Sequence, residues 1–211
     1  LLSPFDECLK RDLIIYPNFI TDAEETDFSS YFDQKLKRLK YETAHWDSAI
    51  TDFRELEISN LPTDLEMTRI RIVDCLKQYC PKDVTINPMT HILDLNSNGS
   101  IKQHIDSVKF CGPNLAILSL LSDCMLCLTV PPKEEIVYTP FMDSYSRSEN
   151  LGTIGDTKMV HIKRKSLYVL KDRLRYEAFH SILSKEEMSK HGFCEIAKGR
   201  RISMICRSMP K

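Results

Sequence analysis

From Val84 to the C-terminal end, the chain alternates short apolar segments with turn residues. Turn signals such as Asn-Ser-Asn-Gly at 96–99 and Cys-Gly-Pro at 111–113 separate the segments, which are rich in β-branched and aromatic residues. This pattern is typical of sheets built from many short strands. We expect about eight such strands, at 84–95, 101–108, 115–121, 125–130, 159–162, 167–170, 176–183 and 202–207.

Helical patterns are confined to the region before Val84. Thr21 and Glu24 have the capping-box spacing that marks the start of a helix, and Pro62 and Pro81 bracket a second amphipathic segment. The elements predicted in this region are a strand at 11–16, a helix at 22–39, strands around Trp46 and at 50–58, and a helix at 64–79.

Two helices followed by many short strands indicate a mainly β chain with flanking helices, an α+β protein with a jelly-roll (double-stranded β-helix) core. We expect a single domain over residues 1–211, with a helix-and-strand buttress at 1–83 and the jelly-roll core at 84–211. Residues 131–158 are polar, rich in Ser, Asp, Glu and Pro, and long for a loop in a compact domain. We expect a disordered insert there, with a mobile cover over a site as the alternative.

Composition excludes several classes of protein. With 211 residues, 42% hydrophobic residues, 28% charged residues and a net charge of -1, the chain has the profile of an ordinary globular protein. The near-neutral balance argues against a wide surface for gripping nucleic acid. No apolar stretch approaches the roughly 20 residues of a membrane span. Basic clusters at 35–40 and 163–165 are expected to be solvated surface charge.

The 8 cysteines show no compact disulfide spacing, and several lie within apolar segments. We expect free, buried thiols. Cys124 and Cys127 have the spacing of half a zinc site, but no second pair with finger spacing follows them. Core thiols are therefore favoured over zinc.

His104 and Asp106 are two residues apart on a predicted strand, so their side chains share one face. His180 alternates with apolar neighbours in a later strand and is expected to point into the barrel. Two histidines and one carboxylate form a facial ligand set that leaves three positions of an octahedral iron open. A His-x-Asp tripeptide alone is a weak signal, because surface or core polar residues often produce it by chance.

A strand near the C-terminus adds weight to this hypothesis. Arg201, Ser203 and Arg207 alternate along it and share one face, where two guanidiniums would suit an acidic co-substrate. Arginines without acidic partners inside a core would otherwise be costly. The alternation fits equally well a strand that turns these residues to solvent and its apolar residues, beginning with Ile202, toward the core. The pattern alone leaves both orientations open.

Three blocks of the sequence resemble the AlkB family of iron(II)- and 2-oxoglutarate-dependent dioxygenases. They are IKQHIDSVKFCG at 101–112, SLYVL at 166–170 and GRRISMICRS at 199–208. The family signature is His-x-Asp, a distal His and Arg-x-Asn-x-Thr-x-Arg. The similarity extends from Asp12 to Pro210, and the sequence of these blocks most resembles a mitochondrial branch of the family.

The resemblance implies a metal site and a reaction. Iron(II) would be held by His104, Asp106 and His180. The family's chemistry consumes O2 and converts 2-oxoglutarate into succinate and CO2, while a C–H bond of the substrate is oxidised.

The resemblance also implies how the co-substrate is bound. Arg201 would pair with the distal carboxylate of 2-oxoglutarate, helped by the hydroxyls of Ser203 and Tyr168. Arg207 would lie near the metal-chelating end. In this orientation the strand presents both arginines to the cofactor.

Departures from the family pattern bear on the substrate. Ser203 and Ile205 stand in place of the signature Asn and Thr, and Val108 stands where base-repairing members have an acidic residue. The resemblance therefore implies that a protein, a small metabolite or mitochondrial RNA is hydroxylated or demethylated, and duplex DNA is not expected. An RNA would use the basic residues Lys198, Arg200 and 163–165 around the mouth of the site.

The mitochondrial branch implies a place in the mitochondrial matrix and a link to mitochondrial metabolism and regulated necrotic cell death. A different class of function stays open beside the enzyme. A non-catalytic jelly-roll module could keep the fold and the metal site for binding a partner.

Overall fold

The computed structural model describes residues 4–44, 49–130, 145–146 and 156–210. Its strands form one curved sheet in the order β1-β8-β4-β10-β3-β9-β5-β7, with β2 and β6 also paired to β3, and every pairing is antiparallel. The strands are β1 (Leu13–Tyr16), β2 (Ile50–Ile58), β3 (Thr90–Ile105), β4 (Asn114–Leu120), β5 (Cys124–Val130), β6 (Tyr145–Ser146), β7 (Asp156–Ile162), β8 (Leu167–Lys171), β9 (Phe179–Ile182) and β10 (Arg201–Arg207).

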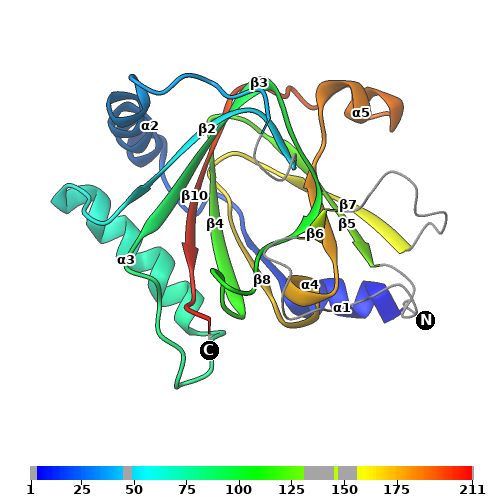
Figure 1. The fold of residues 1–211 in the computed structure, drawn as a ribbon, viewed down its shortest axis with the longest axis horizontal. Coiled ribbons are helices and arrows are strands. Elements are labelled where there is room, and N and C mark those ends of the chain that lie inside the picture. Colours follow the sequence, from blue (N-terminus) through cyan, green and yellow to red (C-terminus); the bar gives the residue numbers. More distant parts are fainter. Residues whose placement is uncertain (1–3, 45–48, 131–144, 147–155, 211) are drawn as a thin grey trace.

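Helices flank this sheet. They are α1 (Pro4–Asp12), α2 (Asp22–Leu36), α3 (Thr63–Lys77), α4 (Asp172–Tyr176) and α5 (Lys185–Lys190). Figure 1 shows α2 and α3 together on one side of the sheet, and α1 and α4 beside each other near its lower end. The arrangement is the mainly β, jelly-roll architecture with flanking helices that the sequence predicts. The described residues include no helix long and apolar enough to cross a membrane.

Two apolar clusters lie on opposite faces of the sheet. The outer cluster joins α2 and α3 to the sheet through residues such as Phe28, Ile72 and Met204. The inner cluster fills the curve of the sheet, with residues such as Leu93, Leu126 and Ile182. Each Å² of apolar surface removed from water stabilises a folded protein by about 25 cal/mol, so both clusters are major sources of stability.

The two-sided burial settles the orientation of β10. Ile202 and Met204 belong to the outer cluster, while Arg201 and Ser203 turn the opposite way, toward a cavity inside the curve of the sheet. Apolar residues of β10 such as Ile202 face the outer cluster and its polar residues face the cavity, because this strand is covered on both faces. The apolar residues do face a core, as the alternative expected, but Arg201 and Ser203 are buried and do not face solvent.

The two long helices begin as expected and end earlier. Thr21 caps α2 with the predicted capping box, in which its hydroxyl accepts from the backbone N–H of Glu24. The helix ends at Leu36 instead of Leu39, whose side chain is 40% exposed. The helix predicted at 64–79 is α3, which ends at Lys77.

The turn predicted at 96–99 is wrong, because β3 runs from Thr90 to Ile105 without a break. A Cβ on Gly99 would lie 2.7 Å from the backbone oxygen of Asp52, so this glycine permits the close approach of β2. β3 pairs with β10 in its first half and with β9 in its second. One continuous strand therefore crosses from one part of the sheet to the other.

Smaller differences concern short helices. Residues 11 and 12, predicted as strand, end α1, and the start of the strand predicted at 176–183 is the end of α4. Helices this short give too little periodicity for the sequence to reveal. Trp46 and most of the segment 131–158 lie outside the described residues; within that segment the backbone of β6 pairs with β3 at 104 and 105.

Candidate metal centre

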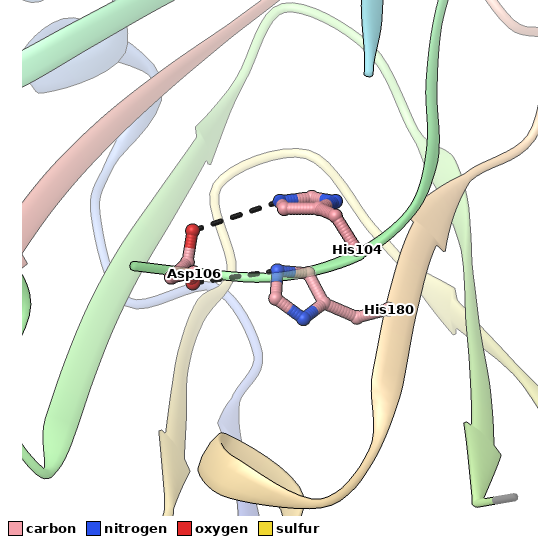
Figure 2. Close-up of side chains that lie close together, drawn as sticks. All are labelled: His104, Asp106 and His180. Carbon is pink, nitrogen blue, oxygen red and sulfur yellow. Dashed lines mark ion pairs between the residues drawn. The ribbon is translucent and has the colours of Figure 1, made fainter. Parts of the chain in front are cut away.

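His104 and His180 lie on neighbouring strands, and the register of β3 and β9 makes them Cα partners. Their ring centroids are 4.2 Å apart. Asp106 follows just beyond the end of β3, with Oδ1 3.6 Å from Nε2 of His104 and Oδ2 3.4 Å from Nε2 of His180. Figure 2 shows the carboxylate facing both rings. The three ligand atoms lie within 4.8 Å of one another, so the convergence expected from the sequence is present.

The hydrogen bonding of His104 directs its second ring nitrogen toward this group. Its Nδ1 lies 2.9 Å from the backbone carbonyl of Lys102. A carbonyl only accepts, so Nδ1 donates to it, and Nε2 is the nitrogen that faces Asp106. Metal-binding histidines are commonly oriented by such a bond from their second nitrogen.

The electrostatics of the group keep its atoms available as ligands. Burial alone would raise the pKa of Asp106, but His180 and His104 hold this pKa well below its usual range. Burial, together with the nearby His104, lowers the pKa of His180. An ionised carboxylate beside a neutral imidazole is the protonation state that a metal ion requires.

A cavity of about 110 Å³ adjoins the three residues. Its other polar lining residues are His91, Tyr168, Arg201, Ser203 and Arg207. The remaining lining consists of aliphatic side chains and Cys111. The cavity therefore brings together all seven residues singled out from the sequence. An apolar enclosure with a few convergent polar groups is the usual form of a small-molecule site.

Arg201 is a buried cation within this cavity. Its side chain is 2% exposed, and its Nε donates to the hydroxyl of Ser119 at 2.8 Å. It also hydrogen-bonds Tyr168, whose pKa burial raises to about 12 against the opposing effect of the Arg201 charge. The phenol therefore stays protonated and can donate a hydrogen bond. Among the described residues, no carboxylate forms an ion pair with Arg201, which favours an anionic ligand.

Arg207 and His91 connect the cavity to β2. Arg207 forms an ion pair with Glu57, and Nε2 of His91 lies 2.9 Å from a carboxylate oxygen of Glu55. Glu55 and Glu57 alternate along β2 and so share one face of it. Sequence reasoning missed His91 and both glutamates, since nothing in the pattern said that β2 would lie beside β3.

Several of the unsatisfied polar atoms belong to residues that line this cavity. In the described part of the chain, 5 buried side-chain nitrogen or oxygen atoms have no hydrogen-bond partner. Three belong to residues that line the cavity: Nδ1 of His180, an Nη of Arg201 and Nε of Arg207. Buried polar groups are normally satisfied, so this concentration indicates a polar ligand. The donor set fits a metal ion together with a carboxylate-bearing molecule.

The basic residues considered for RNA binding are engaged elsewhere. The buried ammonium of Lys198 donates to the carbonyls of Gly99 and Leu183 at 2.6 and 2.5 Å. Arg200 bonds both carboxylate oxygens of Asp94, a fully buried residue that also pairs with Arg54.

Arg164 and Lys165 are likewise occupied, whereas Lys163 is exposed. Arg164 forms an ion pair with Glu25, and Lys165 forms one with Asp22. None of these basic side chains lines the cavity, so the prediction that they surround its mouth is not supported by the described contacts. All 8 cysteines are free thiols, and Cys124 and Cys127 are buried as the core-thiol interpretation predicts.

Comparison with solved structures shows the fold. The chain matches the epimerase SnoN, solved with Fe3+, α-ketoglutarate and nogalamycin RO, with a TM-score of 0.65 at 15% identity over 95% of this chain and 80% of that one. It matches a prolyl hydroxylase from Trichoplax adhaerens with a TM-score of 0.58 at 13% identity, over 97% and 86% of the two chains. It also matches OsALKBH1 with a TM-score of 0.58 at 11% identity, over 98% and 99%.

Comparison with curated sequences shows the family, although no family model matches the chain. The mitochondrial α-ketoglutarate-dependent dioxygenase alkB homologue 7 of Mus musculus is 34% identical over 96% of this chain and 81% of its own length. The protein of the same name from Bos taurus is 36% identical over the same shares. With this identity over almost its whole length, the chain belongs to the alkB homologue 7 family of α-ketoglutarate-dependent dioxygenases.

Proposed function

We propose that the protein is an iron(II)- and 2-oxoglutarate-dependent oxygenase whose active site is the cavity described above. The observation that carries this proposal is the convergence of His104, Asp106 and His180 beside a buried, carboxylate-free Arg201 in one enclosure. A facial set of two histidines and one carboxylate suits iron(II) because it leaves positions open for a co-substrate and oxygen.

In this proposal each ligand residue has a defined task. Nε2 of His104 and of His180 supply neutral donors, and Asp106 supplies the negative charge that favours a divalent ion. The carbonyl of Lys102 fixes the tautomer of His104. Bound iron(II) with 2-oxoglutarate and O2 supplies an oxidant for a C–H bond of the substrate, with release of succinate and CO2.

We assign the binding of 2-oxoglutarate to the residues around Arg201. The free Nη of Arg201 and the hydroxyls of Tyr168 and Ser203 would hold its distal carboxylate, while Ser119 keeps the guanidinium in place. Arg207 would lie near the chelating end. The aliphatic lining excludes water, which strengthens these charged contacts.

Metal binding gives the first test. Iron(II) and 2-oxoglutarate, added without oxygen, should produce a weak visible charge-transfer band, and His104→Ala should abolish it. His161→Ala is a matched control, because Nε2 of His161 lies 2.7 Å from Asp123 in a histidine–aspartate pair that does not line the cavity. The absence of a band in the unmodified protein would contradict the proposal.

Turnover separates the enzyme from a non-catalytic module that keeps the fold. Mitochondrial protein and metabolite fractions should stimulate succinate release, and Asp106→Ala should eliminate this release. A protein that binds both iron and 2-oxoglutarate but releases no succinate with any fraction would favour the binding module.

We propose a protein or a small metabolite as the substrate. The near-neutral charge and the internal engagement of Lys198, Arg200 and Arg164 support this choice over RNA. Affinity for a mitochondrial transfer RNA transcript, measured at increasing salt, is a direct test. Weak binding is expected, whereas tight binding with a steep salt dependence and RNA-stimulated succinate release would identify RNA.

We infer a mitochondrial location from the names of the two relatives, and we propose the matrix from the resemblance to the mitochondrial branch of the AlkB family. Fractionation of organelles with an antibody to this chain tests it. We also propose that residues 1–211 act as one domain, which is supported by the pairing of β1 with β8 and of β2 with β3 in the same sheet. Cooperative unfolding in a single transition is expected.

A further inference from the structure

Arg175 is the largest of the fully buried side chains, at 0% exposure, and it lies in α4. Among the described residues, no carboxylate forms an ion pair with it. Its guanidinium instead donates four hydrogen bonds, all of them to backbone carbonyls. A buried cation is costly unless polar groups surround it, so this arrangement needs a specific reason.

All four carbonyls belong to the loop that joins β3 to β4. The distances are 2.9 Å from Nη1 to Asp106, 3.4 Å from Nη2 to Ser107, 2.8 Å from Nη2 to Cys111 and 3.0 Å from Nε to Gly112. The guanidinium therefore bonds the start of the loop, at 106 and 107, and its end, at 111 and 112, and so holds the two ends together.

The loop carries one of the three candidate ligands beyond the end of its strand. β3 ends at Ile105, so Asp106 lies outside the strand that positions His104. At the far end of the loop, the backbone N–H of Gly112 donates to the carbonyl of Ser208 at 2.8 Å. Arg175 adds the bond that fixes the backbone of Asp106 itself.

Arg175 also lies on the segment that leads to the third candidate ligand. α4 ends at Tyr176, and His180 follows in β9. The guanidinium thus links the chain segment before His180 to the loop that holds Asp106. Only arginine offers a planar fork of five N–H groups that can reach four carbonyls at once; lysine has three donors on a single atom.

We propose that Arg175 is a positioning residue for the metal centre: it fixes the backbone of Asp106 relative to the strand of His180. The inference rests on the proposed function, because it assigns these residues to a metal. Arg175 itself touches neither the metal nor the co-substrate. It acts through the loop, and its loss should weaken metal binding in protein that is still folded.

Cobalt(II) alone, without 2-oxoglutarate, is a suitable probe, because its visible spectrum reports both occupancy and coordination geometry. The full chain carrying Arg175→Lys should bind cobalt(II) at least about tenfold more weakly, as expected when a group that orients a ligand is altered. Its cobalt spectrum at saturation should also change. Titrations are made well below the unfolding midpoint of each protein.

Arg54→Lys is the matched control. Arg54 is also a mostly buried arginine that donates to two backbone carbonyls, those of Leu36 and Leu39, but it lies on the outer side of the sheet. Its replacement should lower the unfolding midpoint and leave cobalt(II) affinity and spectrum unchanged. Arg175→Met serves as a second variant with no donor and should bind more weakly than Arg175→Lys.

Each outcome is decisive. Unchanged affinity and spectrum in folded Arg175→Lys would overturn the proposal, and so would equal losses in Arg175→Lys and Arg54→Lys, which would indicate general destabilisation. If the unmodified protein binds no cobalt(II), the proposed metal site is itself wrong. If the unmodified protein binds and only the Arg175 variants weaken, the inference holds.

Discussion

His104 and His180 are directly opposite each other across two antiparallel strands, with ring centroids 4.2 Å apart. Opposite residues in a sheet have their Cβ atoms about 5 Å apart, so strand register alone brings the two imidazoles together. Asp106 then needs only to turn back from the end of β3 to face both rings. The candidate centre thus depends on one strand pair and one loop.

Asp106→Asn should reduce cobalt(II) or iron(II) affinity by more than about 100-fold, exceeding the usual cost of altering a residue that only supports a ligand. The amide keeps the size of the side chain but removes the charge that lies between the two histidines. Calorimetric titration measures the effect. Asp123→Asn is the control, because Asp123 pairs with His161 away from the cavity; equal losses in both variants would contradict the assignment.

Arg201→Lys should raise the concentration of 2-oxoglutarate needed for half-maximal turnover by roughly 10- to 100-fold, the range expected for a lost hydrogen bond between charged groups. Lysine keeps the charge but cannot bind a carboxylate with two parallel hydrogen bonds. Succinate release at varied 2-oxoglutarate measures it. Arg71→Lys alters an arginine of α3 that pairs with Glu24 of α2, and it should leave this concentration unchanged.

Gly112→Ala should destabilise the protein by roughly 1–3 kcal/mol or more, the usual effect of overpacking. A Cβ there would lie 2.2 Å from the backbone oxygen of Met209, and backbone cannot move aside easily. Urea unfolding measures the loss. Gly199→Ala is the control, since its nearest neighbour is an atom of Ser122 at 3.6 Å. Similar stabilities for both variants would show that the loop adapts.

The stability of the protein should rise with pH above about 8 because of Lys198. Burial lowers the pKa of its ammonium from 10.5 to about 8. Between these values the unfolded chain binds more protons than the folded protein, so the free energy of unfolding increases with pH. The full difference is roughly 3 kcal/mol, at about 1.4 kcal/mol per pKa unit.

Urea unfolding at several pH values, compared with Lys198→Met, isolates this contribution. The variant should lose the rise, although its stability at neutral pH also changes because the carbonyls of Gly99 and Leu183 lose their donor. Replacing Lys163, an exposed lysine, should leave the slope intact. Parallel slopes for the unmodified protein and Lys198→Met would refute this origin.

The sequence predicted that His104, Asp106 and His180 converge and that Arg201 lies on a strand, and the structure has both features. Periodicity alone could not orient β10, because apolar packing covers one of its faces and the cavity lies on the other. The resemblance to the AlkB family indicated the orientation in which the arginines of this strand face the cofactor.

What the sequence could not provide were partners set by tertiary contacts. Ser119 of β4, Glu57 of β2 and Arg175 of α4 bond residues of the site or of its loop, and no local pattern specifies these neighbours. The turn at 96–99 was predicted wrongly because of Gly99. A glycine needed for close packing cannot be told from a glycine needed for a bend in a sequence.

β3 joins two parts of the sheet in one strand, but its pairing changes register between Ile101 and His104. Leu95 is the cross-strand partner of Arg201, and His104 follows on the same strand. Ile101 and His104 both line the cavity although they are three residues apart, so the irregularity between them is what turns the imidazole inward. Homologous chains that keep the candidate metal centre should therefore keep this irregularity, and deleting one residue there should turn the imidazole out of the cavity.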